Sequence, residues 1–203
     1  MASSWPPSSI ARAPRSASAA EGRHFLSPRL FHFSDDPSIA RFIPRPVAVP
    51  SARPAGRDWL NGPLVWAIEE RRQYLYLFPR DCPRILLWPA ARTRAEDLAL
   101  WWENRTCAAV AHIEEAWFER LKTAVLHRYE LPAEAFEDLD DAGMWVAREA
   151  VTPLAVEALS DLPGVLAALD VELRVMPSLL PLKGVWETSL HASGVRLRNA
   201  AGW

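Results

Sequence analysis

The sequence predicts an α+β fold: a single domain with one curved sheet, mixed or antiparallel, and peripheral helices. Apolar runs of strand length recur along the chain, and segments with helical spacing lie between them. Half of the 203 residues are hydrophobic, which is enough to bury a sizeable core in one domain. No internal repeat is present.

Residues 1–28 predict a disordered tail, because Ser, Ala, Pro and Arg dominate there and Glu21 is the only acidic residue. An acid-poor, Arg- and Ser-rich start is also typical of organelle targeting peptides, which leaves that alternative open. Residues 29–203 are expected to form the globular domain.

Strands in the first half of the chain are predicted where apolar residues are contiguous, at 30–33, 63–68 and 84–88. Helical segments are predicted at 37–41, 69–76 and 94–104. The first of these begins at Pro37, with Ser34 or Asp35 as its cap. Between the first two strands, residues 44–63 contain five prolines and predict a long loop.

In the second half, apolar residues at helical spacing predict a helix from Ile113 to Leu121, with charged residues on its other face. Alternating or apolar runs predict strands at 123–131, 144–150, 171–175 and 195–198. Proline starts and apolar spacing predict helical segments at 153–159, 163–169 and 181–190.

The net charge and the cysteine content exclude several classes to which the protein could belong. The net charge of −2 provides no field for nucleic acid or an anionic membrane, and no apolar run reaches the roughly 18 residues that span a bilayer. The two cysteines, Cys82 and Cys107, are too few for a disulfide framework and their spacing suggests no metal site. We therefore expect a cytoplasmic protein without a metal.

His32 lies in the first predicted strand between Phe31 and Phe33. Because side chains alternate along a strand, it is expected to face the side of the sheet opposite to the phenylalanines. A neutral imidazole there can hydrogen-bond a ligand hydroxyl or take a proton. The alternative is a histidine whose ring is satisfied by a backbone carbonyl.

Arg80, Asp81 and Arg84 form a charged corner, which prolines restrict between two apolar stretches. Guanidinium groups can clamp a phosphate or carboxylate, so Arg80 and Arg84 are candidate anion ligands. Asp81 offers a partner within the corner, which favours an internal ion pair instead. Cys82 is expected to be a packed thiol, because no histidine or nucleophile motif accompanies it.

Two glutamates and several aromatic residues complete the candidates. Glu172 shares one side of a strand with Arg174, while Glu187 lies beside Trp186 in a predicted helix and could belong to the surface. Trp66 and Tyr76 could stack on a flat ring, although aromatic residues in strands usually belong to the core. The sequence has no Walker loop, GxGxxG, GxSxG, HExxH or zinc ligand set, which excludes most common enzyme classes.

Four segments resemble a mostly bacterial family known only as a domain of unknown function. The segments are LFHFSDDPSIARFIPRP, GPLVWAI, YLFPRDCPR and VRLRNA. The resemblance covers roughly residues 29–200 and implies no activity.

The strand LFHFS, a loop rich in arginine and proline, and the strand LVWA before a short helix also resemble the start of the ADP-ribosyltransferase-like fold. This resemblance implies NAD as a cofactor and His32 as the residue that contacts its ribose. It implies that an aromatic residue stacks on the nicotinamide, for which Trp66, Tyr74 and Tyr76 are candidates. It also implies a catalytic glutamate on a later strand, with Glu172 as the first candidate and Glu187 as the second.

Three functions follow as hypotheses. The first is an NAD-dependent transferase of the ADP-ribosyl type. The second is a non-catalytic nucleotide- or phosphate-binding module that uses His32, Arg80 and Arg84. The third is a structural or protein-interaction domain that uses exposed tryptophans.

Overall fold

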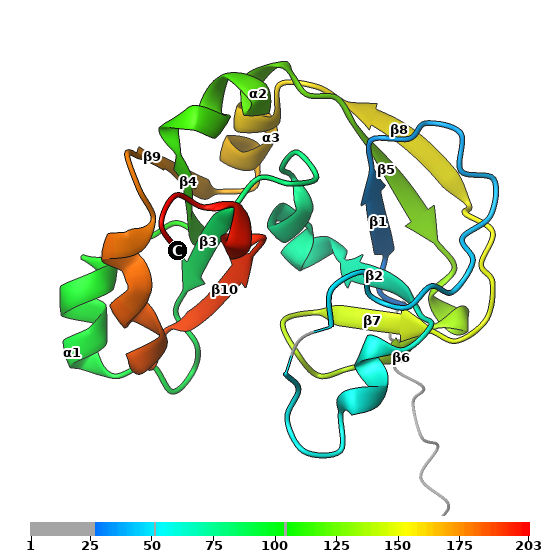
Figure 1. Cartoon of the computed structure of the whole chain (residues 1–203), viewed down its shortest axis with the longest axis horizontal. Coiled ribbons are helices and arrows are strands. Elements are labelled where there is room, and N and C mark those ends of the chain that lie inside the picture. Colours follow the sequence, from blue (N-terminus) through cyan, green and yellow to red (C-terminus); the bar gives the residue numbers. More distant parts are fainter. Residues whose placement is uncertain (1–26, 51, 104) are drawn as a thin grey trace, which may run out of the picture.

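The computed structural model describes residues 27–50, 52–103 and 105–203. In this part of the chain the strands form two separate sheets, with short helices around them (Figure 1), so the α+β class is confirmed. The expectation of one sheet is wrong, because the strands divide between two. The predicted tail lies outside the described residues except for 27 and 28.

The first sheet is antiparallel, with strand order β6-β7-β2-β1-β5-β8. Its strands are β1 (Leu30–Ser34), β2 (Val65–Glu69), β5 (Leu126–Leu131), β6 (Glu137–Asp138), β7 (Met144–Ala147) and β8 (Ala155–Leu159). The central pair, β1 and β2, carries the two segments in which His32 and Trp66 lie.

The second sheet is mixed, with strand order β10-β3-β4-β9. Its strands are β3 (Arg84–Trp88), β4 (Ala109–Glu114), β9 (Val171–Met176) and β10 (His191–Val195). Only β4 and β9 pair in parallel. Every residue of β3 and β4 is buried, as expected for central strands covered on both faces.

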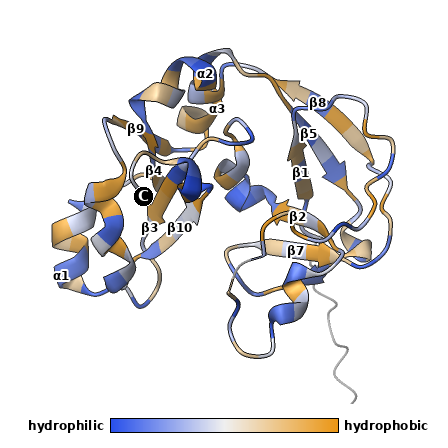
Figure 2. Cartoon of the chain, in the orientation of Figure 1, coloured by the Kyte–Doolittle hydropathy of each residue, from blue (hydrophilic) through white to orange (hydrophobic). Residues whose placement is uncertain are grey.

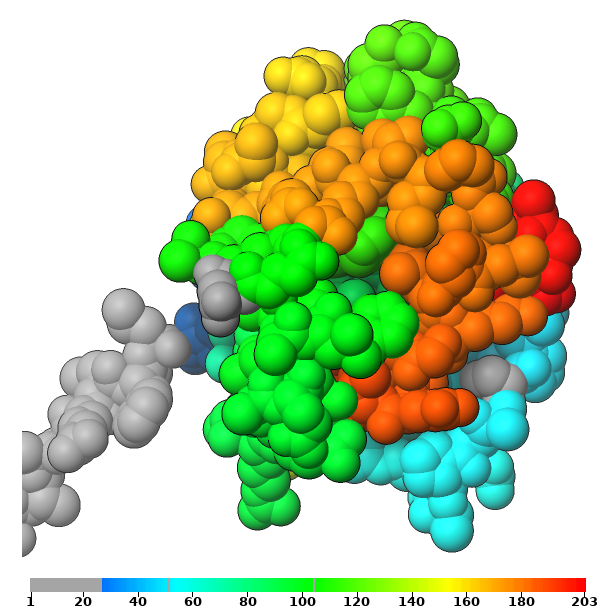
Figure 3. Space-filling model, turned by 90° about the vertical axis from the view of Figure 1, so that its left-hand side faces the viewer, coloured from blue at the N-terminus to red at the C-terminus, as the bar shows by residue number. Residues whose placement is uncertain are grey.

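The helices are short. They comprise α1 (Ala95–Asp97), α2 (Phe118–Thr123) and α3 (Leu162–Ala168), with 3₁₀ or π turns at Asp58–Asn61, Glu70–Tyr76, Leu98–Trp102, Glu115–Trp117, Ala133–Ala135, Leu180–Glu187 and Leu197–Asn199. In Figure 1, α2 and α3 lie together at the end of the molecule where the chain passes between the sheets. In Figure 3, the outer side of the second sheet is covered by the α1 region and by the C-terminal third of the chain. Asp97 joins these two regions, because it accepts hydrogen bonds from the Ser189 amide at 2.8 Å and hydroxyl at 2.6 Å.

The main hydrophobic core connects the two sheets. Phe31 and Ile68 of the first sheet belong to the same buried cluster as Ile85 and Leu86 of the second. Figure 2 shows hydrophobic residues along strands of both sheets. A smaller cluster, which includes Phe42 and Tyr129, lies on the opposite face of the first sheet under the segment that follows β1. The first sheet is therefore covered on both faces beside β1.

Several predicted elements differ from the structure. Residues 37–41 form no helix: they have no regular structure and bend at positions 37 and 40, before Phe42 pairs with Val151. Residues 155–159 form β8 rather than a helix, since the edge of the first sheet supplies their partner β5. The helix predicted from Ile113 begins later, because Ile113 and Glu114 are the last two residues of strand β4.

The last strand is also shifted: residues 191–195 form β10, and a 3₁₀ turn follows at Leu197–Asn199. Arg196 separates the two, with φ of 57°, in the left-handed region that interrupts a strand.

No helix within the described ranges combines the length and hydrophobicity that crossing a membrane requires.

His112 predicts how the stability of the fold depends on pH. It is 3 % exposed on β4, and burial lowers its pKa from 6.5 to about 4. The unfolded chain therefore binds a proton that the folded chain excludes, so stability is full above pH 6.5 and falls as the pH drops toward 4. By about pH 5 the loss is about 2 kcal/mol from this residue.

We expect His112→Asn, which cannot titrate, to show a drop in melting temperature between about pH 7.5 and pH 5 that is smaller by about 4 to 8 °C than in the wild type. Scanning calorimetry of both proteins at both pH values is the measurement. An equal drop in the two proteins would show that His112 does not carry this pH dependence.

Candidate functional site

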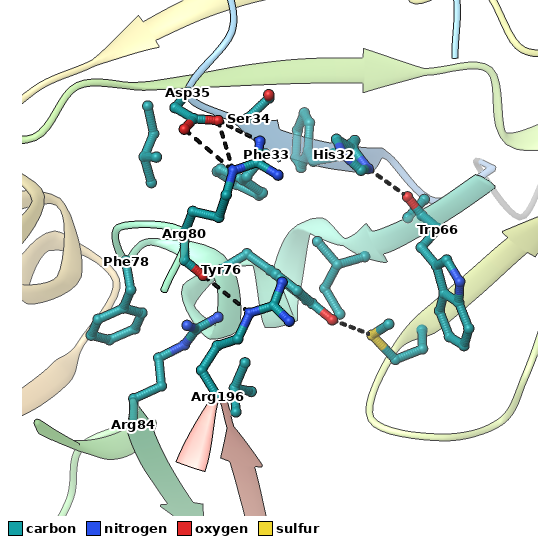
Figure 4. A pocket seen from close by; sticks show the side chains of 16 residues that line it. His32, Phe33, Ser34, Asp35, Trp66, Tyr76, Phe78, Arg80, Arg84 and Arg196 are labelled. Atoms are coloured by element: carbon teal, nitrogen blue, oxygen red, sulfur yellow. Dashed lines mark hydrogen bonds and ion pairs between the residues drawn. The ribbon is translucent and has the colours of Figure 1, made fainter. Parts of the chain in front are cut away.

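A cavity of about 230 Å³ lies between the two sheets (Figure 4). Strands β1, β2 and β10, the start of β3 and the segment 76–80 contribute its walls. Its apolar lining is Phe31, Phe33, Trp66, Ala67, Ile68, Tyr76, Phe78, Leu126, Met144 and Val195. Its polar lining is His32, Ser34, Asp35, Arg80, Arg84 and Arg196. We call it the intersheet cavity.

The cavity opens where β1 and β2 separate. Their ladder pairs Leu30 with Glu69 and Phe31 with Ile68, and it ends there. Beyond that point His32 Nδ1 lies 2.8 Å from the carbonyl oxygen of Trp66. The imidazole thus occupies the position that a main-chain N–H donor would take in a continuous ladder.

The bond to Trp66 also fixes the protonation of His32. A carbonyl oxygen can only accept, so Nδ1 donates and Nε2 of the neutral ring is left as an acceptor. Burial lowers the pKa of His32 and favours this neutral form. As predicted, His32 faces away from Phe31, and its ring packs against Phe42 at 4.7 Å between centroids. The alternative of a histidine satisfied by a backbone carbonyl is therefore confirmed for Nδ1, and a ligand contact at Nε2 stays a prediction for a residue that borders the cavity.

Arg84 places a buried positive charge at the cavity wall. The residue is 3 % exposed, and its guanidinium donates to the Leu75 carbonyl at 3.0 and 2.8 Å and to the Cys82 carbonyl at 3.1 Å. Within the described chain no carboxylate pairs with it, and burial lowers its pKa from 12.5 to about 10. Phe78 and Tyr76 lie beside the guanidinium, at 4.9 and 5.9 Å to their ring centroids. A buried cation that lacks an anion is costly, and a bound anion would offset that cost.

Arg196 and Arg80 continue the positive charge from Arg84 toward the end of β1, as Figure 4 shows. Arg196 Nε donates to the carbonyl oxygen of Arg80 at 3.2 Å, and the charge of Arg196 contributes to the lowered pKa of Arg84. Arg80 forms an ion pair with Asp35, with Nε 3.0 Å from Oδ1. Among the residues that line the cavity, Asp35 is the one carboxylate.

The expected ion pair within the corner is wrong. Asp81 is exposed; its carbonyl oxygen accepts from Asn199 Nδ2 at 2.8 Å, and its carboxylate forms no ion pair with any residue of the described ranges. Arg80 points to Asp35 instead, and Arg84 turns inward to backbone carbonyls. The side chains of Arg80, Asp81 and Arg84 therefore do not meet, and Arg84 has no partner of opposite charge among the described residues.

The candidate aromatic residues divide into two groups. Trp66 and Tyr76 line the cavity, and the Tyr76 hydroxyl donates to the Met144 sulfur at 3.3 Å. Tyr74 is 3 % exposed and packs edge-to-face on Trp88 at 6.2 Å, which makes it a core residue. The structure brings together His32, Trp66, Tyr76, Arg80 and Arg84 of the predicted ligand contacts.

The predicted catalytic glutamates lie elsewhere. Glu172 is on β9, where its carboxylate accepts from Arg105 at 3.0 Å and from Arg174 at 2.7 Å. Glu187 is exposed at the end of the 3₁₀ segment Leu180–Glu187. Neither lines the intersheet cavity. Residues 27–50, 52–103 and 105–203 also contain no group of three His, Cys, Asp or Glu side chains that could hold a metal.

Cys82 is the packed thiol that the sequence predicts. It is fully buried, and burial raises its pKa to about 12. The thiolate that a nucleophile needs is therefore strongly disfavoured at neutral pH.

Sequence reasoning missed Asp35 and Arg196 as cavity residues. The sequence pattern makes Asp35 one of two candidate helix caps, whereas in the structure it follows β1 directly and pairs with Arg80, 45 positions away. The pattern around Arg196 predicts a strand. The signal that could have indicated Arg196 is the YLFPRDCPR segment, because Arg84 can be buried in that segment only if another strand covers it.

The comparisons with known proteins give one match. A family described as a family of unknown function (DUF6886) matches residues 31–200. No curated protein matches the chain, and no solved structure matches it. The matched range contains every residue of the intersheet cavity.

Proposed function

The chain belongs to the DUF6886 family, and we propose that its intersheet cavity binds a nucleotide of the NAD class. The observation that carries this proposal is the uncompensated guanidinium of Arg84 in the cavity wall. Arg196 adds a second positive charge beside it, so the phosphate of a nucleotide supplies the missing anion.

The rest of the lining fits the other parts of a nucleotide. Nε2 of His32 is an acceptor for a ribose hydroxyl, because Nδ1 is committed to Trp66. Tyr76 and Trp66 offer aromatic surface to a flat ring. This combination also agrees with the role that the ADP-ribosyltransferase-like resemblance gives to His32.

The cavity lining supports nucleotide binding better than it supports ADP-ribosyl transfer. A transferase of the ADP-ribosyl type needs a carboxylate beside the ribose, and Glu172 and Glu187 lie outside the cavity. Asp35, the carboxylate in the lining, is engaged by Arg80. We therefore propose nucleotide binding as the function, and ADP-ribosyl transfer is an activity to test once binding has been measured.

A thermal-shift titration tests the proposal. NAD at 100 times its dissociation constant would stabilise the folded protein by about 2.7 kcal/mol. For a domain of this size we expect the melting temperature to rise by about 5 to 10 °C. Adenosine, which has no phosphate, should produce a much smaller shift. If neither NAD nor any other nucleotide shifts the melting temperature at millimolar concentration, the proposal is wrong.

A further inference from the structure

A second cavity, of about 350 Å³, adjoins the intersheet cavity. The two share His32, Ser34, Trp66 and Arg80, so they meet where β1 and β2 separate. We call the second one the loop cavity, because the segment 36–47 after β1 forms most of its outer wall. Small-molecule sites usually occupy about 300 to 1,000 Å³. The intersheet cavity alone falls below this range, and the two cavities together fall within it.

Two arginines without a counter-charge line the loop cavity. The side chains of Arg41 and Arg45 make no hydrogen bond and no ion pair with any described residue. The carboxylate in the same lining, Asp36, accepts from the amide and hydroxyl of Ser38 at 2.8 and 2.7 Å. The loop cavity therefore has a positive charge that is available to a ligand.

The main chain holds these two arginines in place. Phe42, next to Arg41, exchanges hydrogen bonds of 2.8 and 2.9 Å with Val151. Arg45 exchanges bonds of 3.2 and 3.1 Å with Leu64, which precedes β2. Phe42 also packs on His32, the residue common to both cavities. The main chain of the segment is thus fixed at Phe42 and Arg45, while the side chains of Arg41 and Arg45 are exposed at the cavity.

We propose that the loop cavity binds the second half of a dinucleotide, with Arg41 and Arg45 contacting its phosphate. The proposal rests on the proposed nucleotide binding and specifies its substrate class. Arg84, Arg196 and Arg80 form a row that leads from the intersheet cavity to the junction. Arg41 and Arg45 continue the positive charge beyond it, where the second phosphate of a diphosphate would lie.

A third cavity also adjoins the first but fits an anion less well. It shares Trp66, Tyr76 and Met144 with the intersheet cavity, and the Tyr76–Met144 contact lies between the two. Its lining includes the carboxylate of Asp141 and the guanidinium of Arg53, neither of which forms an ion pair within the described residues. These two charges offset each other, whereas Arg41 and Arg45 outnumber Asp36 in the loop cavity, so a phosphate is attracted more strongly to the loop cavity.

The test compares a mononucleotide with a dinucleotide by calorimetric titration. The probes are nicotinamide mononucleotide and NAD, and the variant is Arg41→Ala/Arg45→Ala. Since a charge-assisted hydrogen bond contributes on the order of a tenfold change in affinity, we expect NAD to bind the variant at least about tenfold more weakly. Nicotinamide mononucleotide should bind it as it binds the wild type. The control is Arg92→Ala/Arg198→Ala, which removes the same charge from exposed positions outside the cavities.

The titrations distinguish a failure of the proposed nucleotide binding from a failure of the role proposed for the loop cavity. If the wild type binds neither probe, the proposed function fails and the dinucleotide inference fails with it. If the wild type binds both probes and the variant weakens both equally, or weakens neither, nucleotide binding stands and the role of the loop cavity is overturned. A matching loss of NAD affinity in the control variant would also overturn it, because the effect would then come from net charge.

Discussion

Replacing Arg84 by methionine is expected to abolish nucleotide binding while the domain remains folded. Arg84 is the buried cation of the intersheet cavity, and methionine retains much of its length without the charge. The variant loses the hydrogen bonds to the Leu75 and Cys82 carbonyls but no longer buries an uncompensated charge. Because these two contributions oppose each other, we expect a net change in stability of at most a few kcal/mol.

The affinity for inorganic pyrophosphate is the sharpest readout for this variant, because pyrophosphate has no ring or ribose. We expect wild-type protein to bind it and Arg84→Met to bind it at least about tenfold more weakly. Calorimetric titration measures both, and circular dichroism checks the fold. Undiminished binding by the folded variant would show that Arg84 is only structural.

Arg196→Asn provides a second variant that should fold. Arg196 has φ of 57°, a conformation that asparagine tolerates well, so the backbone is not strained by the change. It should also weaken pyrophosphate binding, whereas Arg198→Asn, on the exposed neighbouring turn, should not. Equal effects of the two substitutions would contradict an anion site at Arg196.

Replacing His32 by asparagine is expected to weaken nucleotide binding by about tenfold with little loss of stability. The asparagine amide can donate to the Trp66 carbonyl in place of Nδ1, but it has no acceptor at the position of Nε2. His32→Ala should differ, because it leaves the Trp66 carbonyl unpaired and costs about 1–3 kcal/mol of stability in addition to affinity.

Melting temperature and NAD affinity of the wild type and both His32 variants measure this difference. If His32→Asn binds NAD like the wild type, Nε2 does not contact the ligand. If His32→Asn is as unstable as His32→Ala, the hydrogen bond to the Trp66 carbonyl does not contribute to the stability of the fold.

The sequence identified the part of the site that depends on local pattern. Alternation along β1 was sufficient to place His32 opposite Phe31, and the apolar runs around Trp66 and Arg84 predicted β2 and β3. These features depend on neighbouring residues, and periodicity reports them directly.

The predictions that the structure contradicts concern contacts between segments that are distant in the sequence. The pairing of Arg80 with Asp35 spans 45 positions and follows from the arrangement of the two sheets. Glu172 shares its strand face with Arg174, as predicted, but β9 pairs with the outer edge of β4, away from β1. The pattern predicts no element at residues 109–112 and a helix from Ile113, because a fully buried strand such as β4 lacks the alternation that marks a half-exposed one. Sequence periodicity carries no information on which strand becomes the neighbour of another.

A crystal structure of the protein grown with NAD tests the central claim most directly. We expect the ligand at the point where β1 and β2 separate, with a phosphate oxygen within hydrogen-bond distance of the Arg84 or Arg196 guanidinium and a ribose hydroxyl at His32 Nε2. NAD bound away from these residues, or an empty intersheet cavity at saturating NAD, would contradict it.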